Sequence, residues 1–304
     1  MTERSARHGP RATPREVADA VASALFLGYS APMPGGDSRY SDITAAHEAR
    51  LLGVPALAAS LSGAAAYPVG ETVFEAVSGS VSVARYADLR AAGYLAPLAR
   101  AALLGEPLGR TLGELSNEDA HLFARALETA GSKSFGQRLG RALDYALSAG
   151  REATLRDAMR FAAAGAGTSG EPMAREYART FEVTRELARP ALLNSLVRVE
   201  ATRPALVQAY LEVLSEVVDL DVAERVGRKE AEEVSRMANG VLKSGGVYSR
   251  RGLQAITNLD GLLRSDGRLM PTATETPIVA AAFLLALEQG NRLLNHRVRP
   301  APRR

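Results

Sequence analysis

Cysteine and tryptophan are absent from this chain of 304 residues, and lysine occurs only at positions 133, 229 and 243. Without cysteine there is no disulfide, no thiolate nucleophile and no cysteine-type zinc site. None of the three lysines lies in a G-x-x-x-x-G-K motif, and no G-x-S-x-G elbow is present, which argues against a P-loop and a hydrolase triad. The four histidines lack the spacing of a metal site: His8, His47, His121 and His296.

Long hydrophobic runs are also missing. The longest apolar run, from Ile278 to Leu287, is too short to span a bilayer. The N-terminal sequence MTERSARHGPRATPRE has no apolar stretch after its charges, so it does not resemble a signal peptide. We therefore expect a soluble, cytoplasmic protein without a membrane segment.

Positive charge is concentrated at the two ends of the chain. The sequence pI is near 9.3 and the formal net charge is +3. Residues 1–12 carry a net charge of +2 and residues 297–304 a net charge of +4, so the remaining body is acidic at −3. An acidic body argues against a nucleic-acid-binding surface. We predict that residues 1–12 and 297–304 are disordered basic tails that help solubility.

Aromatic residues make up only 5% of the chain, whereas 46% of the residues are hydrophobic. The core must therefore be built from Ala, Leu and Val, and small side chains allow helices to pack closely. No alternating strand pattern, fixed repeat or long linker is evident. The sequence predicts an all-α fold, with residues 13–296 forming a single multi-helical domain of about a dozen helices.

Capping signals place several of these helices. Thr13-Pro14-Arg15-Glu16 reads as a capping box that opens a helix to about residue 27. Similar signals at residues 116–119 and 154–157 open two more helices. We expect Pro55 to kink or divide a helix over residues 43–61. We also expect single helices over residues 172–187 and from about 221 to 242.

A loop over residues 29–42, read as YSAPMPGGDSRYSD and called here the PGG loop, separates the first two helical runs. It can bring the backbone amides of Gly35 and Gly36, the guanidinium of Arg39 and the carboxylates of Asp37 and Asp42 into one small volume. That combination suits a phosphate-bearing ligand with a divalent metal. The alternative is an ordinary connection between helices with solvated polar side chains.

Several segments in order resemble the triphosphoribosyl-dephospho-CoA synthase family, especially its archaeal-type branch. They include the PGG loop, GETVFEAV, REYARTFEVTRELARPAL, DLDVAERVGRKEAEEVSRMANGVL and RGLQAITNLDGLLRSDG, and together they cover about residues 15–290. The resemblance implies an all-helical fold and transfer of a triphosphoribosyl group from ATP to 3′-dephospho-CoA, with release of adenine. ATP and Mg²⁺ are implied on this ground alone.

The polar motifs depart from the family pattern more than the scaffold does. The P-K-P-G-N-V loop of the family reads here as residues 32–37, PMPGGD, and its N-T-N-L-G segment falls at residues 86–90, YADLR. The P-D-T-L-I-A-R-K pattern reads as residues 218–225, VDLDVAER, and keeps Asp219. P-G-T-T-A-D corresponds loosely to residues 272–277, TATETP. In the family pattern, asparagine amides and lysine would donate hydrogen bonds to phosphate and ribose oxygens, and aspartates would bind a metal ion. The residues that replace them here cannot take these roles.

The resemblance nevertheless leaves candidate site residues. Asp42 and Asp219 are the predicted catalytic carboxylates, and the predicted nucleotide-binding residues are Gly35, Gly36, Arg39, Arg125 and Glu182. Asp37 and Asp42 are the predicted metal ligands. Each has a structural alternative: solvated loop charges for Asp37, Arg39 and Asp42, a helix N-cap for Asp219, and a solvated carboxylate for Glu182. For Arg125 the alternative is an ion pair with Glu118 or Glu128 on its own helix.

Two functions follow from this pattern. The first is a nucleotide-dependent transferase that acts on a dephospho-CoA-like acceptor. The second is a catalytically degenerate relative that binds a nucleotide or serves as a helical partner subunit, either in a homo-oligomer or with an active paralogue. Nucleic-acid binding through the arginine-rich tails is a third, less favoured hypothesis, because the body is acidic.

Overall fold

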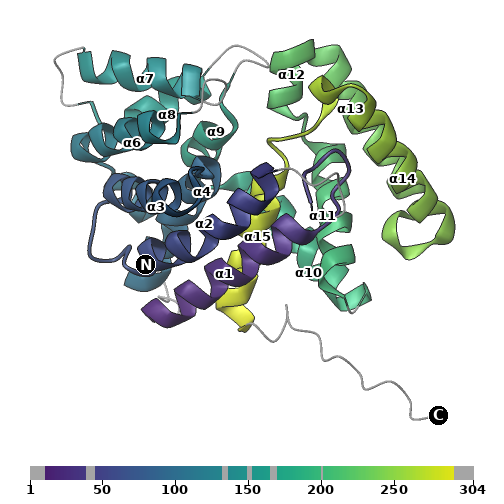
Figure 1. Cartoon of the computed structure of the whole chain (residues 1–304), viewed down its shortest axis with the longest axis horizontal. Coiled ribbons are helices and arrows are strands. Elements are labelled where there is room, and N and C mark those ends of the chain that lie inside the picture. Colours follow the sequence, from purple (N-terminus) through teal and green to yellow (C-terminus); the bar gives the residue numbers. More distant parts are fainter. Residues whose placement is uncertain are drawn as a thin grey trace, which may run out of the picture.

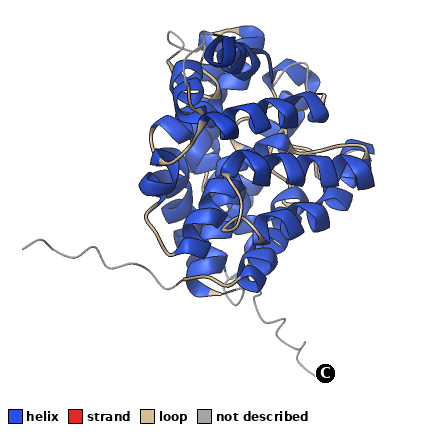
Figure 2. Cartoon of the chain, turned by 90° about the vertical axis from the view of Figure 1, so that its left-hand side faces the viewer, coloured by secondary structure: helices blue, strands red, loops and turns tan. Residues whose placement is uncertain are grey.

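The computed structural model describes residues 11–38, 45–131, 136–148, 153–164, 170–199 and 201–290. Within these ranges the chain forms fifteen α-helices and no strand (Figure 2). The predicted all-α class is confirmed. Both predicted tails lie wholly or almost wholly outside the described residues, so their predicted disorder stays a prediction.

The helices follow one another with short connections (Figure 1). The first eight are α1 (Pro14–Ser30), α2 (Ala45–Ser62), α3 (Val69–Ala84), α4 (Leu89–Leu104), α5 (Leu108–Gly113), α6 (Asn117–Ala130), α7 (Gly136–Ser148) and α8 (Leu155–Ala163). The remaining seven are α9 (Pro172–Ala178), α10 (Arg189–Val199), α11 (Thr202–Glu216), α12 (Leu220–Val226), α13 (Arg228–Lys243), α14 (Arg250–Ser265) and α15 (Glu275–Gln289).

Side-chain caps begin the helices where the sequence predicts them. The Thr13 hydroxyl accepts a hydrogen bond from the Glu16 amide, and the Glu16 carboxylate accepts one from the Thr13 amide. Ser116 with Asp119 and Thr154 with Asp157 form the same reciprocal pair at the starts of α6 and α8. Each pair satisfies two of the amides that a helix start leaves unbonded.

Helix α15 is the central element of the fold. It packs against α1, α4, α10 and α11 (Figure 1), and its residues Thr276–Phe283 are all buried. At the α1–α15 crossing, a Cβ atom on Gly28 would come within 2.5 Å of the Val279 side chain. The absent side chain of Gly28 is what allows this close approach, which fits a core with few aromatic residues.

The segment predicted as one helix over residues 172–187 is instead broken, and this expectation was wrong. Helix α9 ends at Ala178, and Thr180 and Phe181 adopt left-handed φ angles of 56° and 58°. A π-helical turn, Val183–Ala188, then leads into α10. The buried carboxylate of Glu176 accepts hydrogen bonds from the amides of Val183 and Thr184, and so caps the new start.

Two other boundaries differ from or refine the expectations. The run from about 221 to 242 is divided into α12 and α13 by Gly227, which has a φ of 104° that other residues rarely adopt. Pro55 lies inside α2 without dividing it. Proline supplies no amide donor, yet α2 continues on both sides of Pro55.

Candidate functional site

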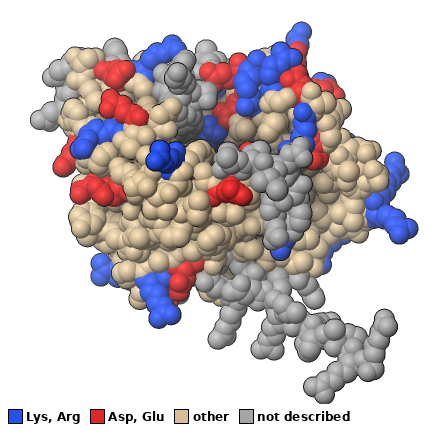
Figure 3. Space-filling view, viewed as in Figure 1, with Lys and Arg blue, Asp and Glu red and all other residues tan. Residues whose placement is uncertain are grey.

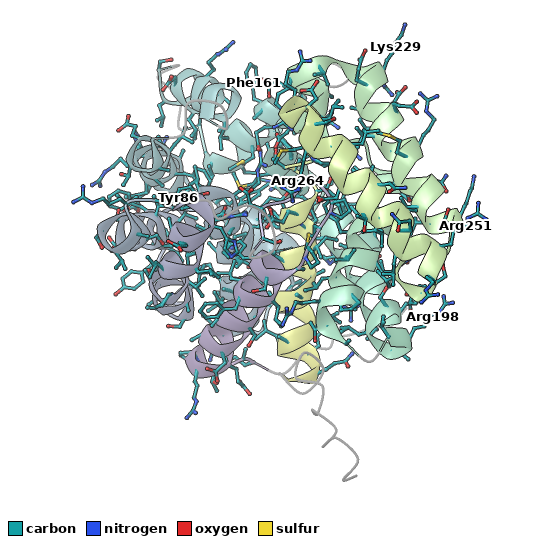
Figure 4. All side chains as sticks on the ribbon, turned by 45° about the vertical axis from the view of Figure 1, so that its right-hand side comes forward. Tyr86, Phe161, Arg198, Lys229, Arg251 and Arg264 are labelled. Carbon is teal, nitrogen blue, oxygen red and sulfur yellow. The ribbon has the colours of Figure 1, made fainter. Side chains whose placement is uncertain are left out.

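The PGG loop is held against two distant helices. The Gly35 amide donates to the Asp260 carboxylate over 2.8 Å, and the Arg264 guanidinium donates to the Gly36 carbonyl over 2.6 Å. Both partners belong to α14, and Arg264 lies toward the middle of the molecule, whereas Arg251 on the same helix lies at its edge (Figure 4). Tyr210 of α11 donates to the Pro34 carbonyl over 3.0 Å. These bonds fix the loop between α1 and α14.

The predicted phosphate-binding amides already have partners inside the protein. The Gly36 amide donates to the Met33 carbonyl over 2.8 Å, and the Gly35 amide is bonded to Asp260. Met33, at the position of the family's lysine, is only 2% exposed and packs in the core. A phosphate would therefore have to replace these internal hydrogen bonds, and the roles predicted for Gly35 and Gly36 stay predictions.

A first buried ion cluster lies beside this loop. Arg50 of α2 donates to Asp88 over 3.0 Å and to Glu275 over 3.2 Å. Its guanidinium carbon also lies 4.3 Å from the centre of the Tyr29 ring, and the Tyr29 hydroxyl donates to Asp88 over 2.9 Å. Asp88 is at the same time the N-cap of α4, because its carboxylate accepts from the Ala91 amide. One cation thus joins α1, α2, α4 and α15.

The charges in this cluster shift one another's pKa values. Burial raises the pKa of Glu275, and the charges of Asp88 and Asp37 raise it further. Burial also favours the neutral form of Asp88, but Arg50 and the hydrogen bonds to Asp88 outweigh it and lower the pKa. Asp37, a predicted metal ligand, is near enough for its charge to contribute to the shift of the Glu275 pKa. Asp37 itself is half-buried.

A second ion cluster surrounds Arg90, which follows Asp88 closely in the chain. Arg90 of α4 makes a two-pronged pair with Asp221 of α12, over 2.7 Å and 3.1 Å. The same guanidinium donates to the Thr272 carbonyl over 2.9 Å and lies 3.8 Å from Glu171. Burial alone would raise the pKa of Asp221, but Arg90 lowers it. Planar, two-pronged Arg–carboxylate pairs are among the stronger ion pairs in proteins.

Glu171 is the most perturbed carboxyl of this cluster. It is 3% exposed and caps α9 by accepting a hydrogen bond from the Ala174 amide over 2.7 Å. Its second oxygen, Oε1, is buried without a hydrogen-bond partner among the described residues. Burial raises the pKa of Glu171 to about 7, although Arg90 acts in the opposite direction. The group can therefore exist in either charge state near neutral pH.

Asp219, a predicted catalytic carboxylate, is 2% exposed and surrounded by donors. One oxygen accepts from the Asp221 and Val222 amides and caps α12. The other accepts from the Ala273 amide, the Thr274 amide and the Thr274 hydroxyl. The structure thus shows the N-cap that the sequence offered as the alternative. The same side chain fastens the segment before α15 to α12, and its catalytic role stays a prediction.

The other predicted site residues lie elsewhere. Arg125 is exposed on α6, with its guanidinium carbon 4.2 Å from the centre of the Phe74 ring. Glu182 is exposed and pairs with Arg179 over 3.2 Å. Neither joins the two ion clusters. Arg39 and Asp42 lie outside the described residues.

Six residues from five parts of the chain therefore form what we call the ionic core: Arg50, Asp88, Arg90, Glu171, Asp221 and Glu275. Sequence reasoning did not select these six as site residues. Asp88, immediately before a helical run, and Glu171, immediately before Pro172, carried readable N-cap signals. Nothing local in the sequence indicates that Arg50 or Arg90 pairs with carboxylates far along the chain.

An apolar pocket of about 560 Å³ adjoins the other side of the PGG loop. Its walls are the loop, the start of α11 and the inner side of α14, and Arg203, Asp260 and Arg264 supply its charged groups. The lining residues are Pro32, Ser38, Arg203, Pro204, Val207, Val247, Leu253, Ile256, Thr257, Asp260 and Arg264. Its size is within the usual range for small-molecule sites.

The described residues do not form a ready metal site. No group of three or more His, Asp or Glu side chains among them is arranged to hold a metal ion. The oxygens of Asp219 are occupied by protein donors, and Asp88 and Asp221 are each paired with an arginine. We therefore derive no step of the chemistry through a metal.

Surface features are less specific. On the face shown in Figure 3, Lys and Arg side chains are interspersed with Asp and Glu rather than gathered into a continuous basic band. Such mixing does not suggest a nucleic-acid groove on that face. Among the described helices, none combines the length and apolar character that a membrane crossing requires.

Comparisons with known proteins agree with one another. A family model described as ATP:dephospho-CoA triphosphoribosyl transferase matches residues 14–294. The fold is similar to a crystal structure from Archaeoglobus fulgidus, provisionally assigned as a triphosphoribosyl-dephospho-CoA synthase, with a TM-score of 0.56 and 21% identity. That likeness covers 80% of this chain and 98% of the other. Among the curated proteins no match is found.

Proposed function

The chain belongs to the ATP:dephospho-CoA triphosphoribosyl transferase family, and on this premise we propose that it transfers the triphosphoribosyl group of ATP to a dephospho-CoA-like acceptor. The observation that carries the proposal is convergence. Residues 86–90, 219–221 and 272–275, which correspond to separate family motifs, are joined by hydrogen bonds at the ionic core, and Tyr29 at the start of the PGG loop donates to Asp88 in the same core. A scaffold retained for packing alone would not need to gather polar segments at one place.

The reaction requires one bond to form and one to break. The acceptor hydroxyl oxygen bonds to C1′ of the ribose of ATP, and the C1′–N9 bond breaks with its electron pair leaving on adenine. The hydroxyl gives up its proton and adenine gains one, so the overall reaction neither consumes nor releases protons. The transition state carries positive charge on the ribose ring, which a nearby carboxylate stabilises.

The ionic core offers both kinds of charge that this reaction uses. Arg50 and Arg90 are the two cations of the ionic core, and we assign them to the triphosphate. Asp88, Asp221 and Glu275 supply negative charge for the ribose ring. Arg39 and Asp42, which follow the described part of the PGG loop, remain candidates for the same two roles. Arg125 and Glu182 are less suited, because both side chains are exposed away from the ionic core.

The pocket beside the PGG loop is suited to the acceptor. Its walls are mostly apolar, which fits a long uncharged arm, and Arg203 and Arg264 lie at the same pocket for phosphates. Pro32 of the pocket wall follows shortly after Tyr29, which donates to Asp88 of the ionic core. An acceptor in the pocket and ATP at the ionic core would therefore approach each other across the loop.

Magnesium, a cytoplasmic location and an oligomeric assembly belong to the proposal as expectations. A divalent ion commonly accompanies a triphosphate and neutralises part of its charge. Chelation of the divalent ions with EDTA is expected to abolish activity, and added Mg²⁺ to restore it. Full activity in EDTA would remove magnesium from the proposal.

The direct test is release of adenine. Purified protein is mixed with ATP, Mg²⁺ and 3′-dephospho-CoA, and free adenine is measured by chromatography. We expect release that depends on both substrates, and a reduction of about tenfold or more in Arg50→Lys, because lysine keeps the charge but loses the planar guanidinium that contacts Asp88, Glu275 and the Tyr29 ring.

Arg198→Lys is the matched control. Arg198 also lies over a tyrosine ring, that of Tyr248 at 3.8 Å, but is exposed on α10 away from the ionic core. It should leave adenine release unchanged. If the wild-type protein binds ATP but releases no adenine with this acceptor, the transferase proposal fails in this form. The nucleotide-binding relative then becomes the better account.

A further inference from the structure

Glu171 differs in one geometric respect from Asp88 and Asp221 of the ionic core and from Asp219 beside it. Asp88, Asp221 and Asp219 have both carboxylate oxygens engaged by arginine, hydroxyl or amide donors. Glu171 Oε1 is buried with no hydrogen-bond partner among the described residues, 3.8 Å from the nearest Arg90 nitrogen. A buried charge that lacks a hydrogen bond is costly, so this position favours a proton on Glu171 whenever negative charge nearby increases.

Arg90 links Glu171 to the accessible part of the site. Its guanidinium lies between Asp221 and Glu171, and the side chains of Arg90 and Asp221 are 13% and 18% exposed, whereas that of Glu171 is 4% exposed. With Glu171 ionised, the three groups carry a net charge of −1. With Glu171 protonated, they are neutral. When Glu171 is ionised, the net negative charge of the three groups repels an anion near Arg90. When Glu171 is protonated, this repulsion is absent.

We propose that Glu171 is a positioning residue that acts through Arg90 and couples the binding of the triphosphate of ATP to the uptake of one proton. The inference rests on the proposed function, because it takes the ionic core as the ATP site. Glu171 does not touch the ligand. It sets the charge around Arg90, and the incoming triphosphate shifts Glu171 toward its protonated form.

The charged groups around Glu171 act on its pKa in opposite directions. Asp221 of α12 disfavours a second negative charge, and Arg90 of α4 favours it. The charge of Glu171 also acts on Tyr94 of α4 and Tyr177 of α9, but burial keeps the pKa of each hydroxyl well above its ordinary value, so neither exchanges a proton near neutrality. Glu171 is thus the group among these that titrates in the relevant range.

Linkage fixes the sign of the expected pH dependence. Glu171 has a pKa of about 7 before ATP binds, and a neighbouring triphosphate raises it. Above this pKa the protein must take up a proton in order to bind, so affinity falls as pH rises. We expect the dissociation constant for ATP to increase about fourfold from about pH 7 to about pH 8, and less in Glu171→Gln, which holds no titrating proton.

The experiment is calorimetric titration with ATP alone, without acceptor, at about pH 7.5 in two buffers of different ionisation enthalpy. The difference in heat between the buffers gives the number of protons taken up. Because the terminal phosphate of ATP itself titrates near about pH 6, the readout is the difference between wild type and Glu171→Gln. We expect the wild type to take up a clear fraction of a proton more than the variant.

Glu176→Gln is the matched control, since Glu176 is another buried glutamate of α9 with both oxygens bonded to amides. It should take up as many protons as wild type. Equal uptake in wild type and Glu171→Gln, or proton release on binding, would overturn the proposal. If Glu171→Gln does not fold, the wild-type pH profile decides: an ATP affinity that stays constant above about pH 7 overturns the coupling. Absence of any ATP binding would instead defeat the proposed function.

Discussion

At the scale of single residues, the ionic core consists of charges that are tolerable only together. Arg50 is held between Asp88 and Glu275, and Arg90 between Asp221 and Glu171. Removing one partner of a buried pair leaves an uncompensated charge and costs several kcal/mol, whereas the intact pair adds little net stability. These residues are therefore better explained by a use in ligand binding than by a contribution to stability.

Glu171 provides a residue-scale prediction about stability. Its folded pKa of about 7 lies above the ordinary value of 4.5, so the folded state keeps a proton that the unfolded state has lost. The stability that Glu171 contributes is therefore present at acidic pH and is lost as pH rises to about 7. Glu171→Gln should gain about 3 kcal/mol relative to wild type between about pH 4.5 and pH 8.

Chemical denaturation at several pH values measures this difference. Glu182→Gln, at an exposed position, is the control and should follow the wild-type curve. Parallel curves for wild type and Glu171→Gln would show that Glu171 is ionised throughout. They would also remove the basis for its role in proton uptake.

Sequence reasoning reached only part of this residue-scale organisation. It identified the segments that meet at the site, because the order of motifs survives in the sequence. It did not identify Arg50 and Glu171, because each pairs with a residue far away in the sequence. Glu275, for example, lies 225 positions from Arg50. It favoured Arg125 and Glu182, whose helical positions are compatible with either a buried or an exposed side chain.

At the scale of elements, the break between α9 and α10 is the least regular part of the described chain. Thr180 and Phe181 are consecutive non-glycine residues with left-handed φ angles. Such a conformation costs roughly 1 kcal/mol per residue. The Glu176 carboxylate and the Phe181 ring, which is fully buried beside Tyr94 and Tyr177, hold the segment in place.

Thr180→Gly is predicted to stabilise the protein by about 0.5 to 1 kcal/mol, because glycine adopts a positive φ without the steric cost of a branched side chain. The matched control is Thr129→Gly in α6, the same substitution at an exposed helical position, which should destabilise by about 0.5 kcal/mol. Thermal unfolding of both variants measures the contrast. A destabilised Thr180→Gly would mean that the Thr180 side chain makes contacts worth more than the strain.

The sequence predicted that helices form in these regions, but it did not predict where they are interrupted. The apolar periodicity continues from residue 172 to 187, so it predicts one helix and carries no sign of the left-handed residues between. Glu176 caps residues 183 and 184 through a turn that forms only after the break exists. The division between α12 and α13 did have a local signal in Gly227, but glycine inside a helical pattern is also tolerated.

At the scale of the whole molecule, chain segments far apart in sequence assemble both the ionic core and the pocket. The pocket combines residues near position 35 with the start of α11 and the inner side of α14. Helix α15 makes this possible, since it contacts helices from both halves of the chain (Figure 1). The all-helical class was predictable from composition, but this arrangement was accessible only through the family resemblance.

Thr257→Trp tests the pocket at this scale. Thr257 lines the pocket and is exposed, so a bulky ring there should fill the space without disturbing the core. We expect KM for dephospho-CoA to rise about tenfold with little change in the affinity for ATP. Asn258→Trp, at the next exposed position on α14, is the control and should leave both unchanged. An unchanged KM in Thr257→Trp would place the acceptor elsewhere.

The hydrogen bonds between α14 and the PGG loop have a kinetic consequence. Because Asp260 and Arg264 hold Gly35 and Gly36 while also lining the pocket, a molecule that settles in the pocket stiffens the backbone that borders the ionic core. Each substrate should then increase the affinity of the protein for the other, and turnover should pass through a ternary complex. Initial-rate plots for the two substrates would intersect rather than run parallel.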